Sequence, residues 1–133
     1  MKRVLIKMFM RKIFEFNEYK YATSISNEEL MEMANVSPKK TGIEDVYIWF
    51  GPNPHYNGKR IKVSNVPNKF SKDDCFTITI PKFKIVGEYN DKLITSKVLS
   101  DIIRFVNLNI KAIEDFSDEL ISTDEFIDKL ISI

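Results

Sequence analysis

The residue types best suited to chemistry lie in the turn-rich segment 51–58 and directly after it. This segment holds His55, the only histidine of the chain, and Tyr56, and it is followed by Lys59 and Arg60. An imidazole can transfer a proton near neutral pH, and a pair of cations can clamp an anion. Together these groups would suit an RNase-like cleavage of a phosphodiester.

The same segment has a simpler interpretation, in which its proline and glycine residues set the backbone angles of a hairpin and leave the imidazole in solvent. Metal-independent phosphodiester cleavage usually needs an acid and a base, and no second histidine is present. Asp45 or Asp73 could complete the pair only if the fold brings one of them close. We therefore favour a structural hairpin over a catalytic loop.

The residue types and their spacing give little support to a metal site or to a reactive thiol. The pair Asp73 and Asp74 offers oxygen ligands, but no EF-hand spacing surrounds it, so a solvated turn is the simpler interpretation. Cys75 is the only cysteine, which excludes an internal disulfide and a thiolate zinc site and fits a reducing compartment. Phosphate-binding, zinc-protease and nucleophile-elbow motifs do not occur. We expect no cofactor and no metal.

The middle of the chain alternates between apolar and polar residues and predicts strands at 45–50, 60–64 and 75–80, with a short fourth piece at 85–86. Pro81 ends the third strand because proline cannot donate to the ladder. The connections between these segments are short, which favours antiparallel neighbours.

The alternation sorts the side chains onto two faces. The first is apolar and comprises Val46, Ile48, Phe50, Ile61, Val63, Phe76, Ile78 and Ile80. The second, which we call the mixed face, comprises Tyr47, Trp49, Arg60, Lys62, Ser64, Thr77 and Thr79. Rings, cations and hydroxyls together are typical of a platform that stacks nucleic acid. Burying the two rings is worth on the order of 8–12 kcal/mol, so we expect the N-terminal helix or a partner to cover them.

The flanking regions are predicted to be helical. Apolar spacing predicts an N-terminal helix up to about Phe16, with a strand over 14–21 as the alternative. Ser26 begins a capping box for a helix over 27–35, whose inner face is Leu30, Met33 and Ala34, and a loop follows at Pro38 and Gly42.

Towards the C-terminus, an apolar stripe predicts a helix over 96–116. A second capping box, at 122–125, begins a final helix. The short connection over 117–121 predicts a helical hairpin packed on the apolar face of the sheet. The expected architecture is one α+β domain over 1–133: an N-terminal helical or extended segment, 1–25, and a core, 26–133, in which this hairpin packs on three or four antiparallel strands.

Charge is unevenly distributed along the 133 residues, although the net charge is only +1. Residues 59–84 are basic and residues 114–129 are acidic. Cations at positions 7, 11 and 12 interrupt the apolar N-terminus, so it lacks a signal-peptide core, and no stretch approaches the length of a membrane span. We therefore expect a cytoplasmic protein without a membrane partner.

Several segments resemble a set of small proteins of tailed bacteriophages and other bacterial mobile elements, for which no activity is settled. They are Thr41-Gly42-Ile43, Tyr47-Ile48-Trp49, His55, the run from Gly58 to Asn65, Phe76-Thr77-Ile78 and the helix start from Ser122 to Phe126. The resemblance covers roughly residues 27–133. It implies a gene product that acts inside the bacterial host cell or in a virion, and it transfers no catalytic residue.

These observations favour a non-enzymatic protein that binds a macromolecular partner, either another protein or a second copy of this chain, in an accessory, inhibitory or virion-associated role. Nucleic-acid binding through the mixed face is the alternative, and a His-dependent nuclease is the third hypothesis. The candidate binding residues are Tyr47, Trp49, His55, Tyr56, Lys59, Arg60, Lys62 and Asn65.

Overall fold

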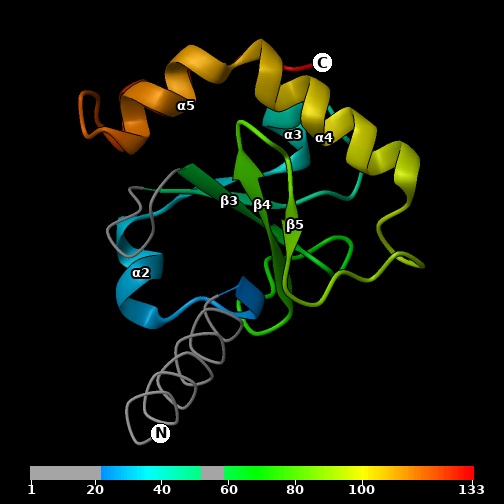
Figure 1. The fold of residues 1–133 in the computed structure, drawn as a ribbon. Helices are drawn as coiled ribbons and strands as arrows, with labels where there is room; N and C mark the ends of the chain where they lie inside the picture. The colour runs from blue at the N-terminus through cyan, green and yellow to red at the C-terminus, as the bar shows by residue number, and fades with distance from the viewer. Residues whose placement is uncertain (1–21, 52–58) are drawn as a thin grey trace, which may run out of the picture.

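The computed structural model describes residues 22–51 and 59–133 (Figure 1). The predicted N-terminal helix, its strand alternative at 14–21, and the candidate residues His55 and Tyr56 lie outside the described residues.

The α+β class and the antiparallel sheet are confirmed. The sheet of the described residues has five strands in the order β1-β2-β3-β4-β5, and each strand is antiparallel to its neighbours. Their bounds are Ala34–Val36, Ile48–Phe50, Lys59–Ser64, Cys75–Ile80 and Ile85–Val86. The last three agree with the predicted strands to within one residue, whereas the predicted strand count of three or four is too low.

The additional strand, β1, replaces the end of a predicted helix. Helix α2, Asn27–Glu32, begins as expected, with the Ser26 side chain accepting from the Glu29 backbone N–H, but Met33 is already extended. Ala34 and Val36 then pair with β2 and bury their side chains in the core. The helix propensity of Ala34 is a weak local preference, and the pairing with β2 and the burial of two side chains outweigh it. A strand of three residues would not be stable without such a neighbour.

Two other boundaries differ from the predictions. Residues Pro38–Thr41 form a short helix, α3, instead of a loop, and Gly42 ends it in the left-handed conformation. Strand β2 begins at Ile48 instead of Asp45, because Asp45 has φ 63° and interrupts the extended backbone.

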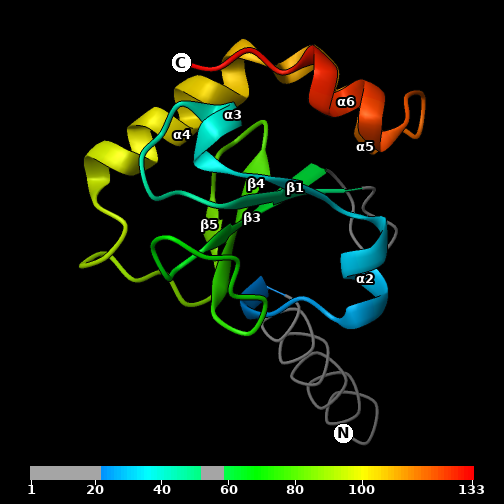
Figure 2. The ribbon, with the colours of Figure 1, turned by 180° about the vertical axis from the view of Figure 1, so that it is seen from behind.

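The apolar face of the sheet is covered by α4 (Ser96–Leu108), α5 (Ile110–Ser117) and α6 (Thr123–Lys129) (Figures 1 and 2). The helix predicted over 96–116 is broken at Asn109, whose side chain binds the backbone of Phe105 and Ile131. The capping box at Ser122 and Glu125 is confirmed. All eight residues predicted for the apolar face belong to one core cluster, which also contains Ile102, Phe105, Val106, Ile113, Phe116 and Phe126.

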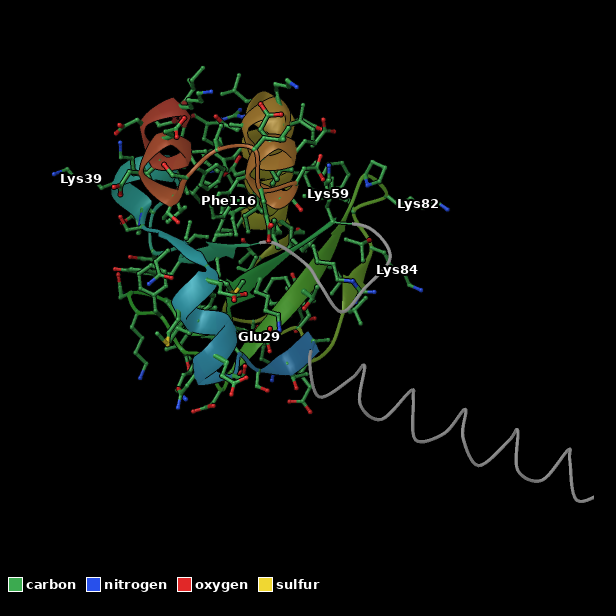
Figure 3. The ribbon with its side chains drawn as sticks, turned by 90° about the vertical axis from the view of Figure 1, so that its left-hand side faces the viewer. Glu29, Lys39, Lys59, Lys82, Lys84 and Phe116 are labelled. Carbon is green, nitrogen blue, oxygen red and sulfur yellow. The ribbon has the colours of Figure 1, made fainter. Side chains whose placement is uncertain are left out.

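The opposite face of the sheet is covered by residues 22–33, which we call the strap. The strap passes below the sheet and continues directly into β1, so that the sheet lies between the strap and the C-terminal helices (Figures 1 and 3). The side chains of Ile25, Trp49 and Cys75 form a second, smaller apolar cluster on this side, against which Leu30 and Met33 pack.

Candidate functional site

The sheet separates the candidate binding residues into three groups along β3. Lys59 and Arg60 begin the strand, opposite Ile80 and Thr79 of β4. Lys62 lies at its centre, between Trp49 and Thr77 on the two neighbouring strands. Tyr47 and Asn65 lie near its far end, where the Ser64 backbone N–H donates to the Tyr47 carbonyl at 3.0 Å. The six described candidates therefore do not form one continuous surface.

Trp49 is fully buried, with 0% of its surface exposed. Its ring lies 5.2 Å from the ring of Phe70, and it shares the second apolar cluster with Ile25 and Cys75. The indole therefore forms part of the interior in this structure and is not available to a partner. Intramolecular cover of the ring was one of the two expectations, and the strap together with Phe70 supplies it.

Lys62 is also buried, with its side chain 7% exposed. Its Nζ donates to the Ser24 carbonyl at 2.7 Å and lies 3.9 Å from a carboxylate oxygen of Glu29. Burial lowers the pKa of this ammonium, and the Glu29 carboxylate opposes that shift. Both partners belong to the strap, so Lys62 is engaged within the protein.

Asn65 acts as a structural clamp. Its Nδ2 donates to the Asp74 carboxylate at 3.0 Å and to the Glu88 carbonyl at 2.6 Å, and its Oδ1 accepts from the Asn90 backbone N–H at 3.0 Å. The amide is buried and joins the loop after β3 to the segment after β5. This role explains the residue without a partner molecule.

Tyr47 is half-buried beside an aromatic residue that the sequence pattern did not reveal. The ring of Phe70 packs edge-on against Tyr47 with the centroids 4.6 Å apart, and Phe70 itself is 37% exposed. Phe70 lies in a loop between two strands, so no periodic pattern marked it.

The start of β3 carries the accessible part of the predicted surface. Lys59 and Arg60 are both half-buried, and Lys59 forms a salt bridge of 3.2 Å with Asp118. The turn between β4 and β5 adds Lys82 and Lys84, which are exposed and point away from the sheet (Figure 3). We call these four cations the basic end.

The register of the sheet places the backbones of these four residues close together, while the side chains of Lys59 and Arg60 leave β3 on opposite faces. Lys59 pairs with Ile80, two residues before Lys82, and the Lys84 carbonyl accepts from the backbone N–H of Thr79, which pairs with Arg60. The basic composition of 59–84 was the available signal for Lys82 and Lys84, but it could not show that they lie beside the start of β3.

The described residues contain no group of three or more His, Cys, Asp or Glu side chains arranged to hold a metal ion. Asp74 accepts from Asn65, and the thiol of Cys75 is buried against Lys72. Burial raises the pKa of Cys75 to about 12, which keeps the thiol protonated and unreactive at neutral pH.

An open hollow of about 390 Å³ lies between the start of α4 and the connection from α3 to β2. Its polar lining combines Glu44, Asp45 and Asp101 with Lys97. Three carboxylates and one ammonium make this lining net negative, but a cluster of acidic side chains around an open hollow does not by itself form an ion site.

Comparison of the chain with protein-family models, with curated protein sequences and with solved structures found no match. Among the helices of the described residues, none has the length and apolar composition needed to cross a membrane.

Proposed function

We propose that this protein acts by binding a macromolecular partner, a protein with an acidic surface, through the basic end of its sheet. The observation that carries the proposal is the exposure of Lys82 and Lys84 on one turn, directly beside Lys59 and Arg60. On the resemblance to mobile-element proteins, we expect this partner inside a bacterial cell or in a virion.

The electrostatics of the basic end suit recognition of an acidic surface. Each exposed ion pair contributes only about 0.2–1 kcal/mol, so the main effects of such a surface are steering of the encounter and choice of partner. Lys59 is already engaged in a salt bridge of 3.2 Å with Asp118. A partner would add carboxylates to the exposed Lys82 and Lys84.

The buried indole of Trp49 favours a protein partner over nucleic acid. Single-stranded nucleic acid is usually bound by stacking bases on exposed aromatic rings in addition to phosphate contacts. Trp49, the largest ring of the mixed face, lies under the strap and is 0% exposed. Phe70 is 37% exposed but packs against Tyr47 near the far end of β3, away from the basic end. Within the described residues the basic end therefore carries charge without an exposed stacking ring, and this fits carboxylates on a protein better.

A charge-reversal experiment tests the proposal. The double variant Lys82→Glu, Lys84→Glu is compared with Lys39→Glu, Lys40→Glu, which makes the same change in net charge on α3. Lys39 and Lys40 are also exposed, and Lys39 points to the opposite side of the molecule from Lys82 (Figure 3).

Proteins captured from a bacterial lysate by the immobilised wild type are identified by mass spectrometry, and their affinity is then measured with purified partner at two salt concentrations. We expect an acidic partner whose binding weakens roughly 10-fold or more in the Lys82/Lys84 variant, weakens with salt, and is unchanged in the α3 variant. An equal loss of affinity in both variants would show that binding depends on the net charge of the protein and not on the basic end. Binding only to single-stranded RNA or DNA would replace the proposal with the nucleic-acid alternative.

A further inference from the structure

The strap crosses the mixed face strand by strand, and polar contacts to the sheet and its loops hold it there. Thr77 Oγ1 of β4 donates to the Ala22 carbonyl at 2.9 Å, and Lys62 Nζ of β3 donates to the Ser24 carbonyl at 2.7 Å. The backbone N–H of Ile25 donates to the Lys72 carbonyl at 2.7 Å. The sheet side chains in these contacts thus bind backbone carbonyls of the strap.

The apolar contacts of the strap are separate from those of the main core. Ile25, which is 2% exposed, packs against Trp49 and Cys75, while the side chains on the other face of the sheet pack with α4, α5 and α6. Removing the strap would therefore expose the small cluster and leave the large one covered. Within the described residues the strap shares only the small cluster, and a region that shares little of the main core can open before the whole molecule unfolds.

Closure of the strap also carries a cost. It removes the ammonium of Lys62 from water, and this desolvation lowers the pKa of Lys62 even though the Ser24 carbonyl accepts from it at 2.7 Å. It also buries Nε1 of Trp49, which has no hydrogen-bond partner within the described parts of the chain. Both groups would regain water on opening, which offsets part of the free energy needed to expose the Ile25 side chain to solvent.

We propose that the strap opens as a unit while the sheet and its C-terminal helices stay folded, and that this opening controls access to Lys62, Trp49 and Cys75. Met33 is extended and leads straight into β1, so the strap can move about this point while β1 stays paired with β2. The strap and the residues under it play no part in the proposed function, so the strap can open whether or not the basic end binds a protein.

The single cysteine provides a direct reporter, because Cys75 is 1% exposed and lies beneath Ile25. The rate at which a thiol reagent labels Cys75 in the native protein measures how often the strap opens. A matched reporter of the main core is Val63→Cys in a Cys75→Ala background, since Val63 is 0% exposed on the opposite face of the neighbouring strand. We expect Cys75 to be labelled at least about 10-fold faster than Cys introduced at position 63, since local opening is more frequent than global unfolding.

Two matched truncations separate local opening from global unfolding. Ile25→Val and Ile102→Val each remove one methylene from a buried isoleucine, the first under the strap and the second in the main core. We expect Ile25→Val to accelerate labelling of Cys75 by roughly 2- to 10-fold. We expect Ile102→Val to accelerate labelling only at position 63. If Ile102→Val accelerates labelling of Cys75 by the same factor as labelling at position 63, exposure of Cys75 requires global unfolding and the proposal is overturned.

Discussion

The buried thiol of Cys75 makes the stability of the folded protein depend on pH. Its thiol lies under Ile25, next to Trp49, and burial raises its pKa from 9.0 to about 12. Nearby Lys62 acts against this shift, because a positive charge favours the thiolate, but desolvation is the larger effect. The folded protein therefore holds the proton of this thiol more tightly than the unfolded chain does.

The consequence is a decrease in stability at alkaline pH. Above pH 9.0 the thiol ionises in the unfolded chain but not in the folded protein, so the free energy of unfolding falls as the pH rises towards about 12. The slope from this group is at most about 1.4 kcal/mol per pH unit. Chemical denaturation of wild type and Cys75→Ala between pH 7 and the alkaline range should show a steeper decline for the wild type.

The other titrating groups are present in both proteins, so the difference between the two curves reports the thiol together with its electrostatic coupling to Lys62. The lowered pKa of Lys62 contributes the opposite slope, since its ammonium is disfavoured in the folded state and stability rises with pH below its ordinary value of 10.5. Parallel curves for the two proteins would show that Cys75 titrates normally in the folded state.

At the scale of elements, Asn109 decides how the C-terminal helices are arranged. A continuous apolar stripe runs through this position, yet the chain breaks there into α4 and α5. The amide donates to the Phe105 carbonyl at 3.0 Å and to the Ile131 carbonyl at 2.8 Å, and it accepts from the Ile131 backbone N–H at 2.7 Å. The side chain of Asn109 thus hydrogen-bonds a backbone carbonyl at the C-terminal end of α4 and also holds the backbone of Ile131 against this helix end.

Asn109→Ala should therefore be costly. It removes all three bonds at a buried site and leaves the backbone groups of Ile131 without this partner, which we expect to lower the free energy of unfolding by about 2–4 kcal/mol. Asn107→Ala is the matched control, because Asn107 is exposed on α4 and alanine favours a helix. Similar stability of the two variants, measured by urea denaturation, would show that the amide bonds of Asn109 contribute little.

At the scale of the whole molecule, the sheet is covered on both faces, and the two covering layers share apolar clusters of different size with it. The C-terminal helices share the large core with the sheet, whereas the strap adds the small cluster around Ile25. Gly87 permits the strap to approach closely: it has φ 94°, and a Cβ placed there would lie 3.0 Å from the Ala22 carbonyl oxygen. A side chain at this position would push against the strap directly.

Gly87→Ala should accordingly displace the strap and accelerate the labelling of Cys75. Gly42→Ala is the matched control, since Gly42 also has a positive φ, 79°, but a Cβ there would meet Ile133 at the C-terminus. Both variants should be destabilised by about 1 kcal/mol or more through backbone strain. Only Gly87→Ala should change the labelling rate, and an equal change in both would mean that the strap and the C-terminal contact are not independent.

The sequence alone determined the features that depend on neighbouring residues. The two-residue alternation in β3 and β4 identified both strands and the apolar face, because successive side chains of a strand point to opposite sides. The serines at 26 and 122 identified the starts of α2 and α6, because a helix N-terminus needs a nearby oxygen acceptor.

Only the tertiary structure decided which of these features face solvent. Strand β1 exists because β2 pairs with it, and the burial of Trp49 and Lys62 depends on where the strap lies. Lys82 and Lys84 lie beside the start of β3 through the register of the sheet. These outcomes depend on contacts between residues far apart in the chain, and local spacing carries no information about such contacts.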